Sequence, residues 1–280
     1  MYNARFEADN GRVFRFGENN IFDINAGDGI SVNLGTSQGF SNIGEVLESQ
    51  SVSGRNLNIS GVLFGDIANE KKKLRNAFSP FSGGRLIFND EYYIRVYVKN
   101  TPAFSAVKEE GKFSLQLFAP IPFFYSIKER RFLLGTVKPL FSFPINYKEP
   151  HYFGETMINK IVDVNNDGDA NVPLNVEIST KATAENIIIT NLRTFQYLKI
   201  NVSIDYGDIV KVWRDEDNVL HATLTSDGEI SDIIAAIDET SELFEAVQGE
   251  NLLTISADSG GDNLNAAFTF NSAAVSVYET

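Results

Sequence analysis

Apolar and polar residues alternate with a period of two along several segments of this 280-residue chain. Side chains of a β-strand point to opposite faces in turn, so this alternation is typical of strands that bury one face. Turn-forming Gly, Asn and Asp residues separate these segments at a spacing typical of β-sandwiches and β-barrels. We therefore expect an all-β fold. The predicted strands include residues 56–60, 92–99, 113–117, 187–189, 198–204 and 275–277.

One segment is predicted to be an α-helix within this β pattern. Asp66 can cap residues 67–78, in which Leu74 and Phe78 share one face with Ile67, and a proline follows the end. Residues 231–237 show a weaker stripe of isoleucines and predict a short helical connection.

Charge and aromatic residues divide the chain into two halves. Residues 1–150 hold 18 basic and 15 acidic residues, a net charge of +3, whereas residues 151–280 hold 6 and 22, a net charge of −16. Of the 22 phenylalanines, 17 lie in the first half. Such a break predicts two domains with different surroundings. Pro139, Pro144 and Pro150 lie close together where the charge changes, so we expect domains at residues 1–140 and 141–280.

Composition excludes several classes of function. The chain has no cysteine, which excludes disulfides, thiolate catalysis and Cys-ligated metals. His151 and His221 are the two histidines, and we expect both to be structural. The net charge of −13 repels phosphate, so we expect no nucleic-acid binding. No apolar run is long enough to span a bilayer and no signal peptide is apparent, so we expect no membrane insertion and synthesis in a cytoplasm.

Two segments are candidates for contacts with other proteins. Residues 27–54 are rich in Gly, Ser and Asn and predict a long loop or arm, either a mobile surface loop or an intersubunit contact. Phe123, Phe124 and Tyr125 are consecutive, and strand neighbours point to opposite faces. At least one of the three rings is therefore expected to contact another domain or another subunit.

Acidic clusters in the second half predict turns rather than metal or catalytic sites. Asp163 to Gly168 matches the first half of an EF-hand loop, but Leu174 stands where the loop needs a bidentate Glu. Residues 215–218 predict an exposed hairpin turn. Neither a G-x-S-x-G motif nor a nucleotide-binding glycine motif occurs. We assign no catalytic, cofactor-binding or metal-binding residue.

Ordered motifs across the chain resemble the distal tail protein (Dit) family of long-tailed siphophages and prophages. The resemblance in the first half consists of Arg55-x-Leu57-x-Ile59-x-Gly61, the predicted helix, Gly84-x-Leu86, the strand from Tyr92, Gly111-x-Phe113-x-Leu115, Pro122-Phe123-Phe124 and Phe141-x-Phe143-Pro144. In the second half it consists of Asn166-Asp167-Gly168, Ile188-Ile189-x-Asn191, Tyr206-Gly207-Asp208 and Gly249-x-Asn251. The stretch at residues 227–243 is longer than the family pattern.

The resemblance implies a fold and a role. The first domain would be a split β-barrel with one helix that forms a hexameric ring, and the second a galectin-like or carbohydrate-module-like β-sandwich. The protein would be a non-enzymatic hub at the virion tail tip, assembled in the host cytoplasm. Its partners would be the major tail protein, the tail-associated lysin or fibre protein and, in some phages, receptor-binding proteins. The Phe-rich first half suits large apolar contacts between subunits.

Two other functions remain open. A sugar-binding module that recognises the host would need an exposed aromatic platform, for which Trp213 is the best candidate, although burial of Trp213 in the core is the simpler expectation. Phe268 and Phe270 have the same strand parity and are expected to face the core. A hydrolase would need a pair of carboxylates in one cleft, and the sequence does not pair them.

Overall fold

The computed structural model describes residues 3–25, 29–38, 43–106, 111–135, 137–139, 154–156, 161–242 and 245–277. The chain forms two compact units. Unit 1 comprises Met1–Lys128 and Ala273–Thr280, and unit 2 comprises Glu129–Ser272. The division therefore falls after residue 128 rather than near residue 140, and the last residues of the chain lie with unit 1. With these boundaries, unit 1 has 14 basic and 14 acidic residues, whereas unit 2 has 10 and 23.

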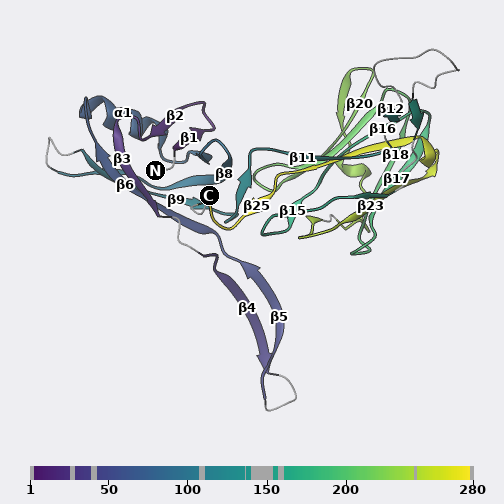
Figure 1. The fold of residues 1–280 in the computed structure, drawn as a ribbon, viewed down its shortest axis with the longest axis horizontal. Helices are drawn as coiled ribbons and strands as arrows, with labels where there is room; N and C mark the ends of the chain where they lie inside the picture. The colour runs from purple at the N-terminus through teal and green to yellow at the C-terminus, as the bar shows by residue number, and fades with distance from the viewer. Residues whose placement is uncertain are drawn as a thin grey trace, which may run out of the picture. The chain divides into compact units, whose positions relative to one another are not determined.

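Unit 1 is built on one antiparallel sheet that does not close into a barrel (Figure 1). The strand order is β2-β1-β7-β8-β9-β6-β3, and the short strand β10 pairs with β8 and with β25. The bounds are β1 Ala4–Ala8, β2 Val13–Phe16, β3 Asn20–Asn25, β6 Arg55–Leu63, β7 Gly83–Phe88, β8 Tyr92–Phe104, β9 Lys112–Ala119, β10 Phe124–Ser126 and β25 Ala273–Ala274.

Phenylalanines fill the core of unit 1. Phe78 is completely buried and stacks on Phe6, with the ring centroids 4.3 Å apart. Phe14 and Phe16 approach the same ring, each with its centroid 6.1 Å away. Aromatic rings bury large apolar areas and add a preference for particular ring geometries. Many of the phenylalanines in the first half therefore pack in the core of unit 1 and are not free for contacts between subunits.

Helix α1, Ile67–Ala77, confirms the predicted helix. The Asp66 side chain accepts a hydrogen bond from the Asn69 backbone N–H at 3.1 Å, which satisfies one of the free amides of the first turn. Leu74 and Phe78 are fully buried, so the stripe expected from the sequence is the face that packs on the sheet.

The segment predicted to be a loop or an arm is a β-hairpin. Strands β4, Val32–Gln38, and β5, Glu45–Val52, pair only with each other among the described residues. Figure 1 shows them as a separate two-stranded ribbon. All eight residues of β5 are exposed. We call residues 29–38 and 43–54 the arm.

Unit 2 is a β-sandwich of two sheets. Val176 and Phe268 of one sheet and Ile189 and Leu198 of the other line the same small pocket, so the two sheets share one core. The six-stranded sheet contains, in order, β11 Arg130–Leu134, β24 Leu264–Phe270, β16 Asn175–Thr180, β19 Ile209–Arg214, β20 Leu220–Ser226 and β21 Glu229–Asp232. The four-stranded sheet contains β14 Ile161–Asp163, β23 Leu252–Ser259, β17 Ala184–Asn191 and β18 Tyr197–Ile204.

Shorter elements complete unit 2. Phe268 and Phe270 are buried, as their shared parity predicted. The predicted helical connection at residues 231–237 is only partly helical, because β21 extends to Asp232 and a single 3₁₀ turn, η1, follows. The remaining elements are the strand pairs β12 Val137–Pro139 with β13 Gly154–Thr156 and β15 Val172–Pro173 with β22 Glu245–Ala246, η1 Ile234–Ala236 and the 3₁₀ turn η2 Gly261–Asn263.

The C-terminal segment returns to the sheet of unit 1. β25 pairs with β10, with Phe124 opposite Ala274, and the Arg55 guanidinium donates a hydrogen bond to the Val275 carbonyl at 3.0 Å. The strand predicted at residues 275–277 is wrong, since strand pairing ends at Ala274. Val277 is nevertheless buried in the core of unit 1.

Candidate functional site

The half EF-hand sequence forms an Asx turn. The Asn166 side-chain oxygen accepts a hydrogen bond from the Gly168 N–H at 3.0 Å, which is the local bond that defines such a turn. The Asp167 carboxylate forms an ion pair with Arg130. Within the described part of the chain, no group of three or more His, Asp or Glu side chains is placed to hold a metal ion.

The acidic segment at residues 215–218 forms the expected hairpin turn between β19 and β20. The Asp215 carboxylate accepts hydrogen bonds from the Asp217 and Val219 N–H groups, at 3.0 and 2.9 Å. It also lies 2.9 Å from His221 Nε2, and this bond, with those from the backbone, lowers the pKa of Asp215. His221 is in β20, as expected, whereas His151 lies outside the described residues.

Trp213 lies on the outer face of its sheet rather than in the core. It alternates along β19 with the buried Val210 and Val212 and is only half-buried itself. Its ring stacks on the ring of His221, with the centroids 5.2 Å apart and 19° between the planes. The simpler expectation, burial in the core, is therefore wrong for Trp213.

Three buried asparagines bring together the family-like motifs of the second half. Asn166, Asn191 and Asn251 are each fully buried. The Asn251 amide donates to the carbonyl oxygens of Val164 and Val247, at 3.1 and 2.7 Å, and its oxygen accepts from Asn191 at 3.2 Å. Buried amides with satisfied hydrogen bonds fix the paths of the loops around them. These motif residues hold the fold of unit 2 rather than forming a reactive site.

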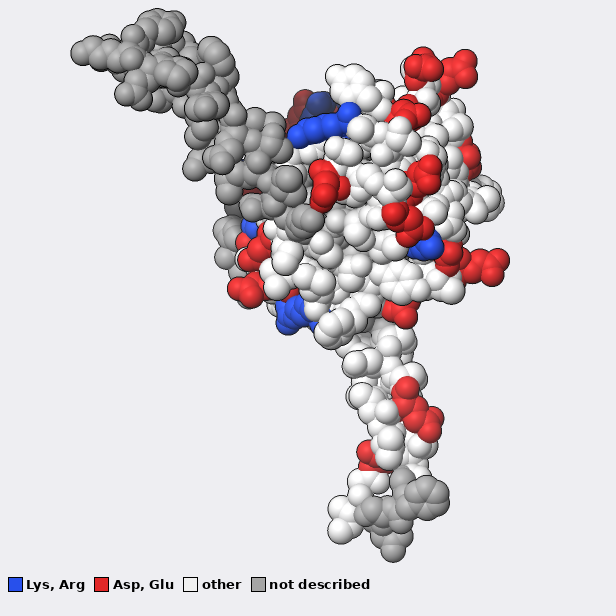
Figure 2. All heavy atoms as spheres, turned by 90° about the vertical axis from the view of Figure 1, so that its right-hand side faces the viewer, with Lys and Arg blue, Asp and Glu red and all other residues white. Residues whose placement is uncertain are grey.

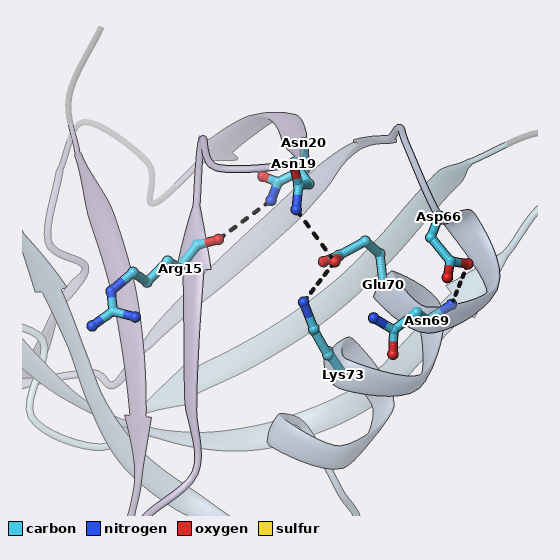
Figure 3. A network of polar contacts seen from close by, with 7 residues as sticks. All are labelled: Arg15, Asn19, Asn20, Asp66, Asn69, Glu70 and Lys73. Atoms are coloured by element: carbon cyan, nitrogen blue, oxygen red, sulfur yellow. Dashed lines mark hydrogen bonds and ion pairs between the residues drawn. The ribbon is translucent and has the colours of Figure 1, made fainter.

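A polar network joins the start of β3 to helix α1 (Figure 3). The buried Glu70 carboxylate accepts a hydrogen bond from Asn19 at 3.4 Å and forms an ion pair with Lys73 at 2.8 Å. The hydrogen bond to Glu70 and its charge raise the pKa of Lys73. The buried Asn20 amide donates to the Arg15 carbonyl at 3.3 Å. This network fixes the first residues of β3 against the helix.

The arm has one apolar and one polar face. Directly paired residues of antiparallel strands share a face. The pairs Val32–Val52, Leu34–Gln50 and Thr36–Leu47 therefore lie together on a side that carries four large aliphatic residues. The opposite side carries the pairs Asn33–Ser51, Gly35–Ser49 and Ser37–Val46. Val32, Leu34, Leu47 and Val52 are 45–61% exposed, so within the chain the apolar side of the arm is uncovered.

The three consecutive aromatics divide between core and surface. Phe124 is completely buried in unit 1, where its ring meets Phe88 at 5.5 Å and the guanidinium of Arg55 at 5.1 Å. Phe124 is therefore a core residue and not an anchor for another subunit. Phe123 and Tyr125 are half-buried, and the Tyr125 ring lies 5.9 Å from that of Tyr93.

Phe81 is a fully exposed aromatic residue that no sequence pattern predicted. Phe81 follows helix α1, has a positive φ of 62° and exposes its whole side chain. A bulky residue rarely adopts this backbone region or a wholly solvated position. Its position between the turn residues Pro80 and Gly83 could have indicated this exposure, because turns usually carry a polar residue there. The alternation pattern cannot report on it because it lies outside any strand.

The face of the protein drawn in Figure 2 displays carboxylates over unit 2. Asp and Glu side chains are scattered over this face, and Lys and Arg are few. The described arm shows no blue in the same view, because its only charged residues are Glu45 and Glu48. No helix among the described residues is long and apolar enough to cross a membrane.

A one-helix antiparallel sheet with a hairpin arm, joined to a β-sandwich, defines a Dit-like fold. The solved structure of SPP1 Dit, described as a paradigm of the hub adsorption apparatus of phages that infect Gram-positive bacteria, matches with a TM-score of 0.67 at 13% identity. The match covers 97% of this chain and 99% of that one. No family model and no curated protein sequence matches this chain.

Two structures of the phage P2 baseplate in its activated conformation are also similar. The structure with calcium matches with a TM-score of 0.55 at 11% identity, over 96% of this chain and 98% of that chain. The structure with strontium matches with a TM-score of 0.52 at 10% identity over the same shares. At such low identity these comparisons establish the fold of both units.

Proposed function

We propose that this protein is a non-enzymatic structural subunit of a phage tail tip, where six copies form a ring that joins the tail tube to the host-adhesion device. The observation that carries this proposal is the similarity to SPP1 Dit, which extends over both units and 97% of the chain. A likeness confined to the β-sandwich would support only a generic binding module, because sandwiches serve many functions. The protein would act in the virion after assembly in the bacterial cytoplasm.

The arm supplies one of the two surfaces that ring formation needs. An isolated two-stranded hairpin is marginally stable in water, and large exposed apolar areas on a soluble protein mark contacts. The apolar side of the arm satisfies both conditions. A ring formed from identical subunits uses two different patches on each copy. Of the two alternatives for residues 27–54, an intersubunit contact is therefore favoured over a mobile surface loop.

The two units suit different partners. Unit 1 is electrically neutral and exposes apolar residues such as Phe81, which fits contacts with the major tail protein and the tail-associated lysin or fibre protein. Unit 2 has a net charge of −13, which fits a solvated position on the outside of the ring or a contact with receptor-binding proteins.

Removal of the arm tests the proposed ring. We expect the full chain to form six-fold rings in electron micrographs and by light scattering at high concentration, alone or with the tail-tip partner. A variant in which a short Gly-Ser linker replaces residues 31–53 should remain monomeric and unfold at an unchanged temperature, because these residues contribute little to the core. Absence of six-fold assembly under any condition, including the intact tail, would contradict the proposal.

Trp213 supports a second candidate, a saccharide-binding surface on unit 2. Its ring lies on the outer face of the sheet and is only half-buried, as an aromatic platform requires, and His221 stacks on one side of it. In a glycan array with the full chain, Trp213→Ala should then remove binding, whereas Tyr206→Ala, at an exposed loop position, should not. Equal binding by both variants, or none by the native chain, would exclude this second function.

A further inference from the structure

Unit 2 has an open hollow of about 300 Å³ on the outer face of its six-stranded sheet. Directly paired residues share a face, so Leu133 of β11, Ala267 of β24 and Glu177 of β16 form one row. Ser179 and Asn265 are the next pair on the same face of β16 and β24. We call the hollow lined by these five residues the trough. Its floor is β24, and its walls on β11 and β16 are roughly 10 Å apart, which is two strand spacings.

Small residues keep the trough open. Ala267, at the floor, is 6% exposed and lies between the longer side chains of Leu133 and Glu177. At one end, an added Cβ atom on Gly135 would lie 2.7 Å from Asn265 Oδ1. Gly135 also has a φ of 84°, a backbone conformation that favours glycine. The chain therefore passes close to Asn265 without a side chain that would fill the trough.

The polar groups of the trough are oriented, and some keep free hydrogen-bonding capacity. Glu177 Oε1 lies 3.6 Å from the Arg131 guanidinium, and Oε2 lies 3.0 Å from Lys211 Nζ. Both cations are about half exposed, so these ion pairs contribute little to stability, although they hold the carboxylate in place. Neither the Ser179 hydroxyl nor the Asn265 side chain forms a hydrogen bond within the described part of the chain.

Positive and negative charges around the trough are balanced. Three cations and three carboxylates lie in its walls or beside them: Arg131, Lys181, Lys211, Glu129, Glu177 and Asp262. The Lys181 N–H donates to the Asn263 carbonyl, which places Lys181 close to Asp262. A site for an anion needs an excess of positive charge, and the net charge of −13 of unit 2 repels anions. The trough therefore suits a neutral ligand.

Hydroxyl groups are the ligand chemistry that these side chains fit. A hydroxyl both donates and accepts, so it can bond to a carboxylate, an amide or another hydroxyl. Leu133 is 49% exposed and provides an apolar wall for the C–H groups of a ring. Clefts that bind small molecules combine apolar walls with a few oriented polar groups in this way. A neutral saccharide satisfies both conditions.

We propose that the trough binds one sugar unit of a neutral oligosaccharide, whose neighbouring units stack on Trp213. Lys211 is the direct partner of Glu177, and Trp213 is two residues further along β19 on the same face. The trough floor and β19 are two strand spacings apart, roughly 10 Å, so several linked sugar units are needed to reach both. This inference rests on the second candidate function and adds the charge, the length and a further binding surface of the ligand.

A glycan array with the full chain, followed by titration of the strongest binder, tests the trough. We expect neutral glycans of about three or more units to bind, with the same affinity at low and high salt, because the ligand has no charge to screen. Ser179→Leu fills the trough and should weaken binding about ten-fold or more. The matched control, Thr223→Leu, adds the same side chain to the same face, opposite Lys211 and away from the trough. Both positions are half-buried, so thermal unfolding should show both variants folded.

The outcomes separate the trough from the Trp213 platform and from the ring. Loss of binding in Trp213→Ala, with native affinity in Ser179→Leu, would overturn the trough and leave the platform in place. Equal losses in Ser179→Leu and Thr223→Leu would also overturn the trough, and binding of acidic glycans alone would contradict the neutral ligand. Absence of binding to any glycan would overturn the trough together with the second candidate function, whereas rings in micrographs would still support the proposed ring.

Discussion

Units 1 and 2 are both antiparallel β structures, yet they differ in core and in surface. Unit 1 packs phenylalanines between one sheet and one helix, is electrically neutral and leaves the apolar side of the arm uncovered. Unit 2 packs mainly aliphatic residues between two sheets, adds three buried asparagines and has a net charge of −13. The surface, rather than the strand content, therefore distinguishes a unit suited to contacts with other proteins from one suited to solvent.

The largest expected effect comes from the core of unit 1. Phe78→Ala removes a ring that contacts Phe6, Phe14 and Phe16, and should lower the free energy of unfolding of unit 1 by about 4 kcal/mol. In calorimetry the transition of unit 1 should move while that of unit 2 stays. The matched control in unit 2, Ile200→Val, should cost only about 1 kcal/mol. A common shift of both transitions would mean that the two units unfold as one.

The asparagine network should give the next largest effect, confined to unit 2. Asn251→Ala leaves the carbonyl groups of Val164 and Val247 without their side-chain donor in a buried place. We expect a loss of about 3 kcal/mol in urea unfolding. Asn201→Ala, at an exposed residue of β18, should change the same quantity by less than about 0.5 kcal/mol. Equal effects at the two positions would show that burial of Asn251 contributes nothing.

Truncation after Ser272 should destabilise unit 1 and leave unit 2 unchanged, which is the opposite of the effect expected for Asn251→Ala. It removes β25, the buried Val277 and the carbonyl of Val275 that accepts from Arg55. We expect roughly 2 kcal/mol less stability in unit 1 and an unchanged transition for unit 2. The two transitions identify which unit responds. If only unit 2 responded, the assignment of residues 273–280 to unit 1 would be wrong.

Acid should give the smallest of the four effects, in unit 2. Hydrogen bonds from Thr240 and then Asn201 lower the pKa of Asp238 to about 2. A carboxylate with a lowered folded-state pKa stabilises the fold above its unfolded pKa of about 4, and this contribution is lost as pH falls from about 4 to about 2. Asp238→Asn should remove a small part of the acid sensitivity of unit 2 in that range. An identical pH profile for the variant would contradict this role.

Local signals in the sequence predicted the elements whose pattern depends on a single buried face. The Asp66 cap and the Leu74–Phe78 stripe located α1, and period-two alternation located β6, β8 and β18. The arm was predicted only as a loop or arm, because its many Gly, Ser and Asn residues are typical of loops and a register shift after Gly35 interrupts its short alternation. Its strand character became visible only through the pairing of β4 with β5.

Long-range pairing explains what the sequence could not predict. The boundary after residue 128 depends on β11 pairing with β24, which lies more than 120 residues later. At least one ring of Phe123, Phe124 and Tyr125 was expected at a domain or subunit interface, but the sequence could not say which ring faces the core, and β10 directs that of Phe124 into it beside Phe88. Phe141, Phe143 and Pro144, at the expected entry to the second domain, lie outside the described residues.

The return of the chain to unit 1 has a mechanical consequence. The chain leaves unit 1 after β10 and re-enters at β25, and these two strands pair antiparallel, with Phe124 opposite Ala274. A force on unit 2 therefore pulls both strands from the same end at once. The hydrogen bonds between β10 and β25 are not sheared against each other, and the load passes to β8 through β10 and to Arg55 through Val275. Unit 2 is tethered by two attachments in parallel, so a break in one strand leaves the other to hold it.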